Sequence, residues 1–160
     1  MQNDLESLAD IDLLVLQAKI LKVLKERGTT RSTNNPVADY AEGLVAKALG
    51  LELVSQSNRG YDATDRRTGE RYEIKSRRIT SHNKSTQLGA LRNLDKEPFD
   101  FLVALIFHED FSVAYAAKIP RLVVIERSKY IAHTNSHKCM LPRSIFKDAR
   151  VEDITTRLAT

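Results

Sequence analysis

The sequence has little of several features that define specialised protein classes. It contains one cysteine, four prolines, six glycines and no tryptophan in 160 residues. Because Cys139 is alone, it cannot form an internal disulfide, which excludes a disulfide scaffold and favours a reducing, cytoplasmic location. The low glycine and proline content excludes collagen-like and wholly disordered chains.

Long hydrophobic runs are also missing. The longest unbroken apolar run covers residues 101–107, which is too short to span a bilayer. The first residues, MQNDLE, lack the basic and apolar stretches of a secretory signal. No glycine-rich phosphate-binding loop occurs, which argues against a nucleotide cofactor. We therefore expect a cytoplasmic protein with no membrane partner.

The remaining composition is that of a folded chain. Hydrophobic residues make up 42% of the sequence and charged residues 29%, and 160 residues are enough for one domain with its own core. We expect a single domain over 1–160. It would consist of an N-terminal helix within 1–30, a core over 34–119 and a C-terminal extension over 120–160.

The start of the chain predicts a long helix. Residues 4–27 contain neither Gly nor Pro, are rich in Leu, Ile and Val, and are followed by Gly28. Apolar residues form two adjacent stripes, which begin at Leu13 and at Ile11. So wide an apolar surface indicates burial on two sides, either against the domain or against a second subunit. This helix is therefore a candidate dimer interface.

A second helix and then several strands are expected beyond this helix. The second helix would lie between a capping Asn35 and Gly50, with Pro36 in its first turn. Two-residue alternation then indicates strands. The expected strands cover 51–56, 61–65, 70–76, 99–107 and 111–119, with a short polar helix over 85–94 and further helices after Pro120 and Asp153. This order indicates an α/β fold with a mixed sheet flanked by helices.

The charge is unevenly distributed. The chain carries a net charge of +4, whereas the residues from Arg59 to Arg92 include nine basic and four acidic ones, a net charge of +5. The rest of the chain is therefore at −1. A local positive field suits a polyanion such as nucleic acid, although a solvated basic face explains the same pattern.

A predicted hairpin brings two carboxylates together. Its connection is RRTG (66–69), and opposed residues in an antiparallel pair have Cβ atoms about 4.5–5.5 Å apart. Two carboxylates that close repel each other, and a divalent cation would compensate. The expected pairs are Thr64–Arg71, Ala63–Tyr72, Asp62–Glu73 and Gly60–Lys75.

The same strands offer further groups for chemistry. Glu73 and Lys75 share one face of their strand because they are two residues apart. The Ile74 carbonyl can supply another oxygen ligand at the strand edge, and Lys75 can orient a water or neutralise phosphate charge. A surface hairpin with scattered charges, or a cross-strand salt bridge, accounts for the same residues without a metal.

Three segments carry a resemblance to a known family. ADYAEGLVA (38–46), GYDA (60–63) and RYEIKS (71–76) resemble the PD-(D/E)xK, or restriction-endonuclease-like, nuclease superfamily, with Tyr61 where the motif's name has Pro. The resemblance covers about half of the chain, over residues 36–107. It implies an αβββαβ core, to which this chain adds an N-terminal helix.

The resemblance also implies an activity and its residues. It implies a metal-dependent DNA endonuclease in which Asp62, Glu73 and the Ile74 carbonyl bind Mg²⁺, with Mn²⁺ as a substitute. Lys75 would assist the attacking water, and Glu42 on the first core helix would reach the same site. The basic residues that follow the catalytic strand, and that would contact DNA phosphates, are Arg77, Arg78 and Lys84. A homodimer is expected, because cutting both strands of a duplex needs two active sites.

Two other functions stay open at this stage. The first is a non-catalytic nucleic-acid-binding or regulatory module that retains the nuclease fold. The second is a protein-interaction module, such as one member of a toxin and antitoxin pair. A purely binding module has no need of two carboxylates held close together, and the +5 segment argues mildly against an interaction module.

Overall fold

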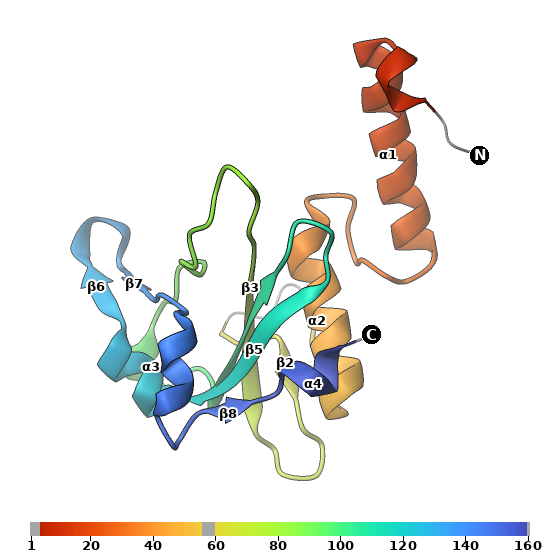
Figure 1. The fold of residues 1–160 in the computed structure, drawn as a ribbon. Helices are drawn as coiled ribbons and strands as arrows, with labels where there is room; N and C mark the ends of the chain where they lie inside the picture. Colours follow the sequence, from red (N-terminus) through yellow and green to blue (C-terminus); the bar gives the residue numbers. More distant parts are fainter. Residues whose placement is uncertain (1–3, 56–59, 160) are drawn as a thin grey trace.

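The computed structural model describes residues 4–55 and 60–159 of the chain (Figure 1). The predicted strand end at Gln56 and the basic residue Arg59 lie outside these ranges. The helices are α1 (Asp10–Glu26), α2 (Pro36–Leu49), α3 (Arg121–Arg127) and α4 (Thr155–Leu158), with short 3₁₀ turns η1 (Leu5–Ser7), η2 (Leu94–Lys96), η3 (Ala132–Thr134) and η4 (Arg143–Lys147). The strands are β1 (Glu52–Leu53), β2 (Ala63–Thr64), β3 (Arg71–Arg78), β4 (Phe101–Phe107), β5 (Val113–Pro120), β6 (Lys129–Ile131), β7 (Ser136–Lys138) and β8 (Glu152–Asp153).

A mixed sheet forms the centre of the fold. Six strands lie in the order β1-β2-β3-β4-β5-β8, and β6 pairs with β7 in a separate hairpin. β3 and β4 are parallel, whereas the other neighbouring strands in the sheet are antiparallel. The predicted α/β class, with a mixed sheet and flanking helices, is therefore confirmed.

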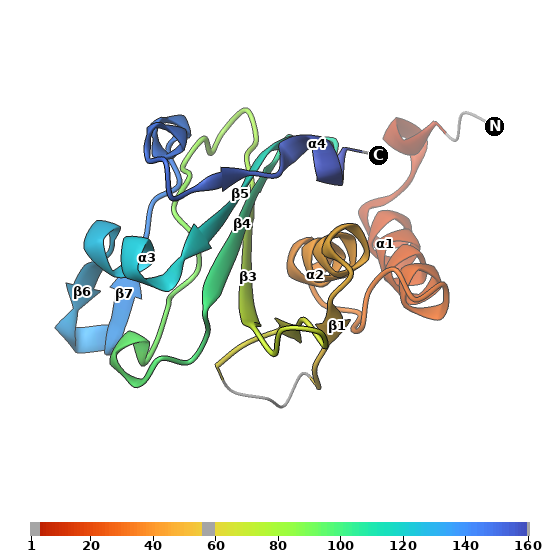
Figure 2. The ribbon, with the colours of Figure 1, turned by 90° about the horizontal axis from the view of Figure 1, so that it is seen from below.

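Helices cover the two faces of this sheet. α2 and α4 pack on one face over Ile74, Val103 and Leu105, and α3 packs on the other over Leu102 and Ala104 (Figure 2). β4 lies between these two hydrophobic clusters, and Leu102 to Phe107 are fully buried. This agrees with its unbroken apolar sequence, since a strand covered on both faces does not alternate.

The chain after β5 belongs to the same packed unit. β8 pairs with β5, and Ile154 and Leu158 are buried against α2. The N-cap of α4 is Ile154, so the predicted cap at Asp153 is wrong by one position, although Asp153 Oδ1 accepts the Thr155 N–H at 2.9 Å.

Local sequence explains the boundaries of α2. The Asn35 side chain accepts the Val37 N–H at 3.1 Å, and Pro36 occupies the first helical position, where its missing N–H costs nothing. Gly50 ends the helix with φ +67°, a left-handed conformation that glycine adopts without strain. The predicted cap, first turn and end are therefore all confirmed.

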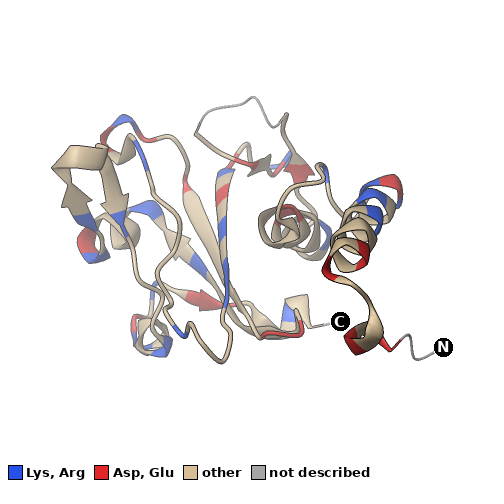
Figure 3. Cartoon of the chain, turned by 90° about the horizontal axis from the view of Figure 1, so that it is seen from above, with Lys and Arg blue, Asp and Glu red and all other residues tan. Residues whose placement is uncertain are grey.

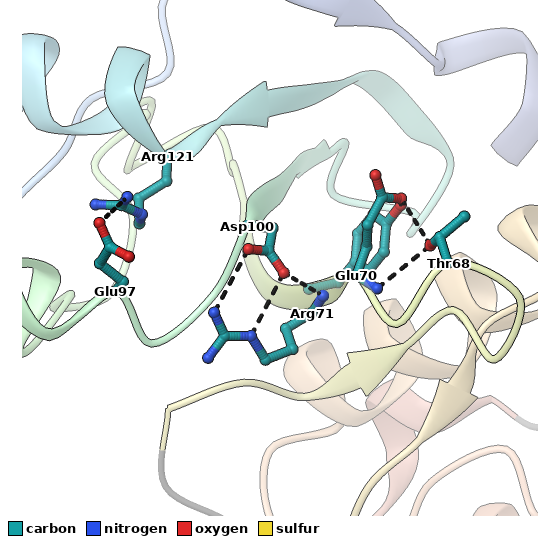
Figure 4. Close-up of polar contacts among 7 residues, drawn as sticks. Thr68, Glu70, Arg71, Glu97, Asp100 and Arg121 are labelled. Atoms are coloured by element: carbon teal, nitrogen blue, oxygen red, sulfur yellow. Dashed lines mark hydrogen bonds and ion pairs between the residues drawn. The ribbon is translucent and has the colours of Figure 1, made fainter.

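A side chain fixes the start of the parallel pair. Asp100 immediately precedes β4, and its Oδ2 accepts the backbone N–H of Arg71 at 2.8 Å (Figure 4). The Arg71 guanidinium also reaches this carboxylate at 3.4 Å, and Arg121 binds Glu97 at 2.7 Å. These contacts set the register in which Glu73 lies beside Leu102 and Lys75 beside Ala104.

The helix predicted over 85–94 is wrong. This part of the crossover from β3 to β4 is largely extended, and its backbone pairs with residues 137–141. Leu91 and His137 exchange two backbone hydrogen bonds, of 3.1 and 2.7 Å, and Leu88 N–H donates to the Cys139 carbonyl at 3.0 Å. Distant partners for these backbone groups outcompete a local helix that Gly89 already weakens. The αβββαβ order is therefore not reproduced, because its second helix is missing.

The predicted first helix is correct in type but not in its burial. A 3₁₀ turn and α1 cover most of the expected range, yet α1 contains no buried residue, with Ile11 64% and Leu14 61% exposed. Burial on two sides against the domain is therefore wrong. Figures 1 and 2 show α1 outside the packed body, beside α2. No helix among the described residues is both long and apolar enough to cross a membrane.

Candidate functional site

The candidate site is built on β3. Glu73, Lys75 and Arg77 lie on one face of this strand, because Tyr72 and Ile74 point to the other face and are buried under α2. The Lys75 Nζ lies 2.6 Å from Glu73 Oε1. Only 13% of the Glu73 side chain is exposed, so this ion pair is held in a largely dry environment.

Asp62 joins the site from the strand before β3. The predicted pairs Ala63–Tyr72 and Thr64–Arg71 are confirmed, but the regular ladder ends there. Asp62 N–H donates to the Tyr72 carbonyl at 2.8 Å, and Asp62 Oδ2 accepts the Ile74 N–H at 2.7 Å. The predicted cross-strand pairs Asp62–Glu73 and Gly60–Lys75 are therefore wrong. The Asp62 carboxylate, rather than a backbone carbonyl, accepts the Ile74 N–H, so the regular ladder does not continue past Ala63–Tyr72.

This replacement leaves the Ile74 carbonyl at the strand edge. The N–H and C=O of one residue in a strand point to the same side, and the Ile74 N–H points to Asp62. Within the described residues, Asp62 Oδ1 accepts no hydrogen bond. The Ile74 carbonyl therefore lies on the same side of β3 as Asp62.

Glu42 approaches the same site from α2. Its carboxylate forms an ion pair with Arg31, whose Nη1 also donates to the Val54 carbonyl at 2.7 Å. The Arg31 backbone N–H binds Asp39 at 2.9 Å, which fixes the loop before α2. The charge of Glu42 is thus partly neutralised within the chain.

The carboxylates at this site affect one another's protonation. Burial raises the pKa of Glu73, and the negative charges of Asp62 and Glu42 raise it further, while Lys75 opposes the shift. Burial also raises the pKa of Glu42, against the hydrogen bond from Arg31, and Asp62 adds to the rise. The negative charges of Asp62 and Glu42 therefore disfavour ionisation of Glu73, while Lys75 favours it.

A cavity opens beside Glu73 and Lys75. It has a volume of about 490 Å³ and is also lined by Gly60, Phe99 and residues 90–93 of the crossover. The Gly60 φ of +124° is a conformation that side-chain-bearing residues rarely adopt. Solvent and small ligands can therefore reach the carboxylate of Glu73 from this side.

The raised pKa of Glu73 gives a stability prediction. A carboxyl whose pKa is raised by folding binds protons more tightly in the native state, so its ionisation lowers stability as pH rises from its ordinary value near 4.5. We expect Glu73→Gln to raise the melting temperature at pH 7, and the difference from the unmodified protein to shrink as pH falls toward 4.5. Calorimetry across this pH range measures the effect. A variant that melts lower at pH 7 would show that the Lys75 ion pair outweighs the burial of charge.

The predicted DNA-contacting residues lie further along the same strand. Arg77 and Arg78 end β3 and line a second cavity of about 980 Å³, together with the start of α2 and part of α1. The Arg78 guanidinium lies 4.7 Å from the centre of the Phe111 ring. Lys84 is exposed in the crossover loop. Figure 3 shows basic residues recurring along β3 and along the loops on the α3 side.

A divalent cation fits part of this arrangement. Mg²⁺ prefers oxygen ligands and is commonly held by one or two carboxylates together with substrate phosphates and waters. Asp62, Glu73 and the Ile74 carbonyl are candidate oxygens of this kind, although Lys75 already neutralises part of the Glu73 charge. Within residues 4–55 and 60–159, no group of three or more His, Cys, Asp and Glu side chains could hold a metal ion by itself.

Sequence reasoning missed Arg31 as a site residue. A single arginine in a loop carries no periodic signal. Its role depends on Val54 and Glu42, which are 23 and 11 residues away along the chain. No pattern of local spacing identifies such a contact.

Comparison with known proteins does not identify the chain. Its sequence matches no family model, and a search of curated proteins gives no match either.

Proposed function

We propose that the chain is a metal-dependent DNA endonuclease of the PD-(D/E)xK type that acts in the cytoplasm. The observation that carries the proposal is the buried Glu73, paired with Lys75 and repelled by Asp62 and Glu42, beside an open cavity. Burying like charges together is unfavourable for folding alone, and perturbed carboxyl groups in a cleft are typical of catalytic sites.

The proposed reaction is hydrolysis of a phosphodiester bond. Asp62, Glu73 and the Ile74 carbonyl would hold Mg²⁺, for which Mn²⁺ is expected to substitute. When bound, the ion stabilises negative charge on the phosphate and lowers the pKa of a coordinated water. Lys75 would orient the attacking water and stabilise the developing charge. A water oxygen bonds to phosphorus, one phosphorus–oxygen bond breaks, and the leaving oxygen takes up a proton.

Other basic residues would position the substrate. Arg77, Arg78 and Lys84 follow the catalytic strand and would bind backbone phosphates, which supports affinity without selecting a sequence. Glu42 would act on the same site through its charge, with Arg31 holding its carboxylate in place.

Two measurements test this proposal. Incubation of supercoiled plasmid with the purified protein should give nicked or linear product with Mg²⁺ or Mn²⁺ and none with EDTA. Mg²⁺ should also raise the melting temperature, because a ligand that binds only the native state stabilises it. Glu73→Gln should lose both effects. No cleavage and no metal-induced shift would contradict the proposal.

A second function has an observation in its favour. Glu73 is already paired with Lys75, and Glu42 with Arg31, so these charges form a network without any metal. That arrangement favours a nucleic-acid-binding or regulatory module that retains this site for structural reasons. DNA binding that persists in EDTA, without metal-dependent cleavage, would support this alternative.

We also propose that two copies pair through α1. Its N-terminal half is acidic, with Asp10 and Asp12, whereas its C-terminal half carries Lys19, Lys22 and Lys25. Two antiparallel copies would therefore match acidic with basic halves around one two-fold axis, while covering the exposed apolar residues between them.

The pairing predicts a change in oligomeric state. Val15→Glu/Ile20→Glu should convert the protein from two chains to one of 18.1 kDa in light scattering after gel filtration, because both residues lie near the middle of α1 and a buried charge in the centre of the interface is unfavourable. Both side chains are exposed, so the fold should keep its melting temperature at high dilution. Glu6→Gln is the matched control at the exposed start of the chain. A variant that still elutes as two chains would show that the dimer interface is not on α1.

A further inference from the structure

A second basic segment lies in the C-terminal part of the chain. From Arg127 to Lys147 there are five Lys and Arg residues and no Asp or Glu, a net charge of +5. The two basic segments together carry a charge of +10 and the other residues carry −6, so the net charge of the chain is only +4.

The fold brings the two basic segments together. Residues 86–91 of the first segment pair with 137–141 of the second, through hydrogen bonds such as Leu141 N–H to the Thr86 carbonyl at 3.0 Å. Residues 90–93, which overlap this pairing at Leu91, line the cavity beside Glu73 and Lys75. The second segment is therefore attached directly to one side of the candidate site.

The β6–β7 hairpin within this segment holds two lysines in an unfavourable position. Lys129 and Lys138 are direct cross-strand partners, and both are exposed. Like charges directly opposed in a sheet lower its stability. No carboxylate pairs with either lysine in the described part of the chain, although Arg127 at the start of the segment pairs with Asp148. An external anion would remove this repulsion.

An aromatic side chain lies between these lysines and the turn. Tyr130 is 54% exposed, its ring centre lies 5.2 Å from that of His137, and its hydroxyl donates to Asn135 Oδ1 at 3.0 Å. Successive residues of a strand point to opposite faces, so Tyr130 and His137 occupy one face of the hairpin and the two lysines occupy the other.

We infer that the β6–β7 hairpin is a nucleic-acid docking surface, on which Lys129 and Lys138 bind backbone phosphates beside the Glu73 cavity. The inference rests on the proposed function, because it supposes that the same nucleic acid passes the site on β3. It adds a contact surface on the C-terminal side of the fold, separate from Arg77, Arg78 and Lys84.

The test removes the two opposed charges. In Lys129→Gln/Lys138→Gln, binding of a fluorescein-labelled 30-base-pair duplex is measured by anisotropy in EDTA over a range of salt concentrations. We expect affinity near 0.1 M salt to fall on the order of ten- to a hundredfold, and the slope of log affinity against log salt to become shallower by about two, since each lost phosphate contact removes roughly one released counterion.

Control variants separate this effect from a general loss of charge. Lys47→Gln/Arg157→Gln removes the same charge from α2 and α4, which cover the other face of the sheet, and should leave the salt slope unchanged. The hairpin variant should melt no lower than the unmodified protein, because its lysines repel each other. A variant that binds the duplex with unchanged affinity and slope would overturn the inference. Binding of the unmodified protein to phosphatidylserine vesicles but not to DNA would also overturn it.

The outcomes also distinguish the inference from the proposed function. A normal salt slope in the hairpin variant, with intact metal-dependent cleavage, would reject the hairpin surface and keep the nuclease. A shallower slope in a protein that never cleaves DNA would keep the hairpin surface and reject the nuclease.

Discussion

Metal-dependent cleavage of plasmid DNA is expected to fall on the order of 10³-fold in Glu73→Gln, because losing one group that stabilises transition-state charge costs about 10²–10³ and the ion it helps to hold is weakened as well. Glutamine has the shape of glutamate and can still accept a hydrogen bond from Lys75, so the strand should keep its structure. The initial rate of conversion from supercoiled to nicked plasmid measures the effect.

Lys75→Ala tests the partner of Glu73. Its rate should fall by about 10²–10⁴-fold, the range typical of a group that takes part in proton transfer. Mg²⁺ should still raise the melting temperature of this variant, because the carboxylate oxygens of Asp62 and Glu73 remain. The two variants thus separate metal binding from chemistry: Glu73→Gln loses both, and Lys75→Ala loses only cleavage.

The matched control lies on the far edge of the sheet. Glu152 on β8 pairs with exposed Arg157 at 3.4 Å, so Glu152→Gln removes the same charge from another strand. It should cleave at the rate of the unmodified protein. Equal rates for Glu73→Gln and Glu152→Gln would remove Glu73 from the chemistry and leave the site as a structural ion-pair network.

The parts of the fold that the sequence predicts well depend on local signals. Asn35, Pro36 and Gly50 bound α2 because their own backbone preferences define helix ends. The unbroken apolar run of β4 predicts a strand covered on both faces, and its burial confirms this. The start of the β2–β3 hairpin also follows from its turn, since Gly69 adopts the positive φ that the connection needs.

The errors arise where distant contacts decide the structure. Leu88, Leu91 and Leu94 recur every three residues as on a helix, yet Leu88 and Leu91 are buried in a segment whose backbone pairs with 137–141, and Leu94 begins the 3₁₀ turn η2. The ladder beyond Ala63–Tyr72 could not be predicted either, since it depends on the Asp62 side chain taking the Ile74 N–H. In both cases the deciding partner is absent from the local pattern.

In the candidate site, too, local patterns predict some features and distant contacts decide others. Two-residue alternation correctly placed Glu73 and Lys75 on one face of β3, and their ion pair confirms that they meet. The part played by Arg31 was not predictable, because it links Glu42 on α2 to the Val54 carbonyl after β1. Even so, the loss of Arg31 is expected to lower stability substantially.

Arg31→Ala should lower the free energy of unfolding by about 2–3 kcal/mol, less than the ~3–5 kcal/mol for breaking a fully buried ion pair, because 27% of the Arg31 side chain is exposed. The loss has two sources: a carboxylate left without its partner, and the lost hydrogen bond to Val54. Urea denaturation at pH 7 measures the change.

A double-mutant cycle separates these two sources. Glu42→Gln removes the charge that Arg31 neutralises, so Arg31→Ala/Glu42→Gln should be more stable than the sum of the single changes by about 1–2 kcal/mol. The remaining loss belongs to the Val54 hydrogen bond. Single changes that add to within about 0.3 kcal/mol would show that Arg31 stabilises the fold without acting on Glu42.

The same cycle has a pH dependence of known sign. Burial raises the pKa of Glu42 and the Arg31 hydrogen bond opposes that rise, so removing Arg31 should raise this pKa further. The destabilisation of Arg31→Ala should therefore be greatest at pH 7 and decrease as pH falls toward the ordinary carboxyl value of 4.5, where Glu42 becomes neutral. Arg31→Ala/Glu42→Gln should not show this dependence, because it lacks the titrating group. Since Glu42 also acts electrostatically on Glu73, the cycle measures how firmly the loop before α2 controls the charge of the candidate site.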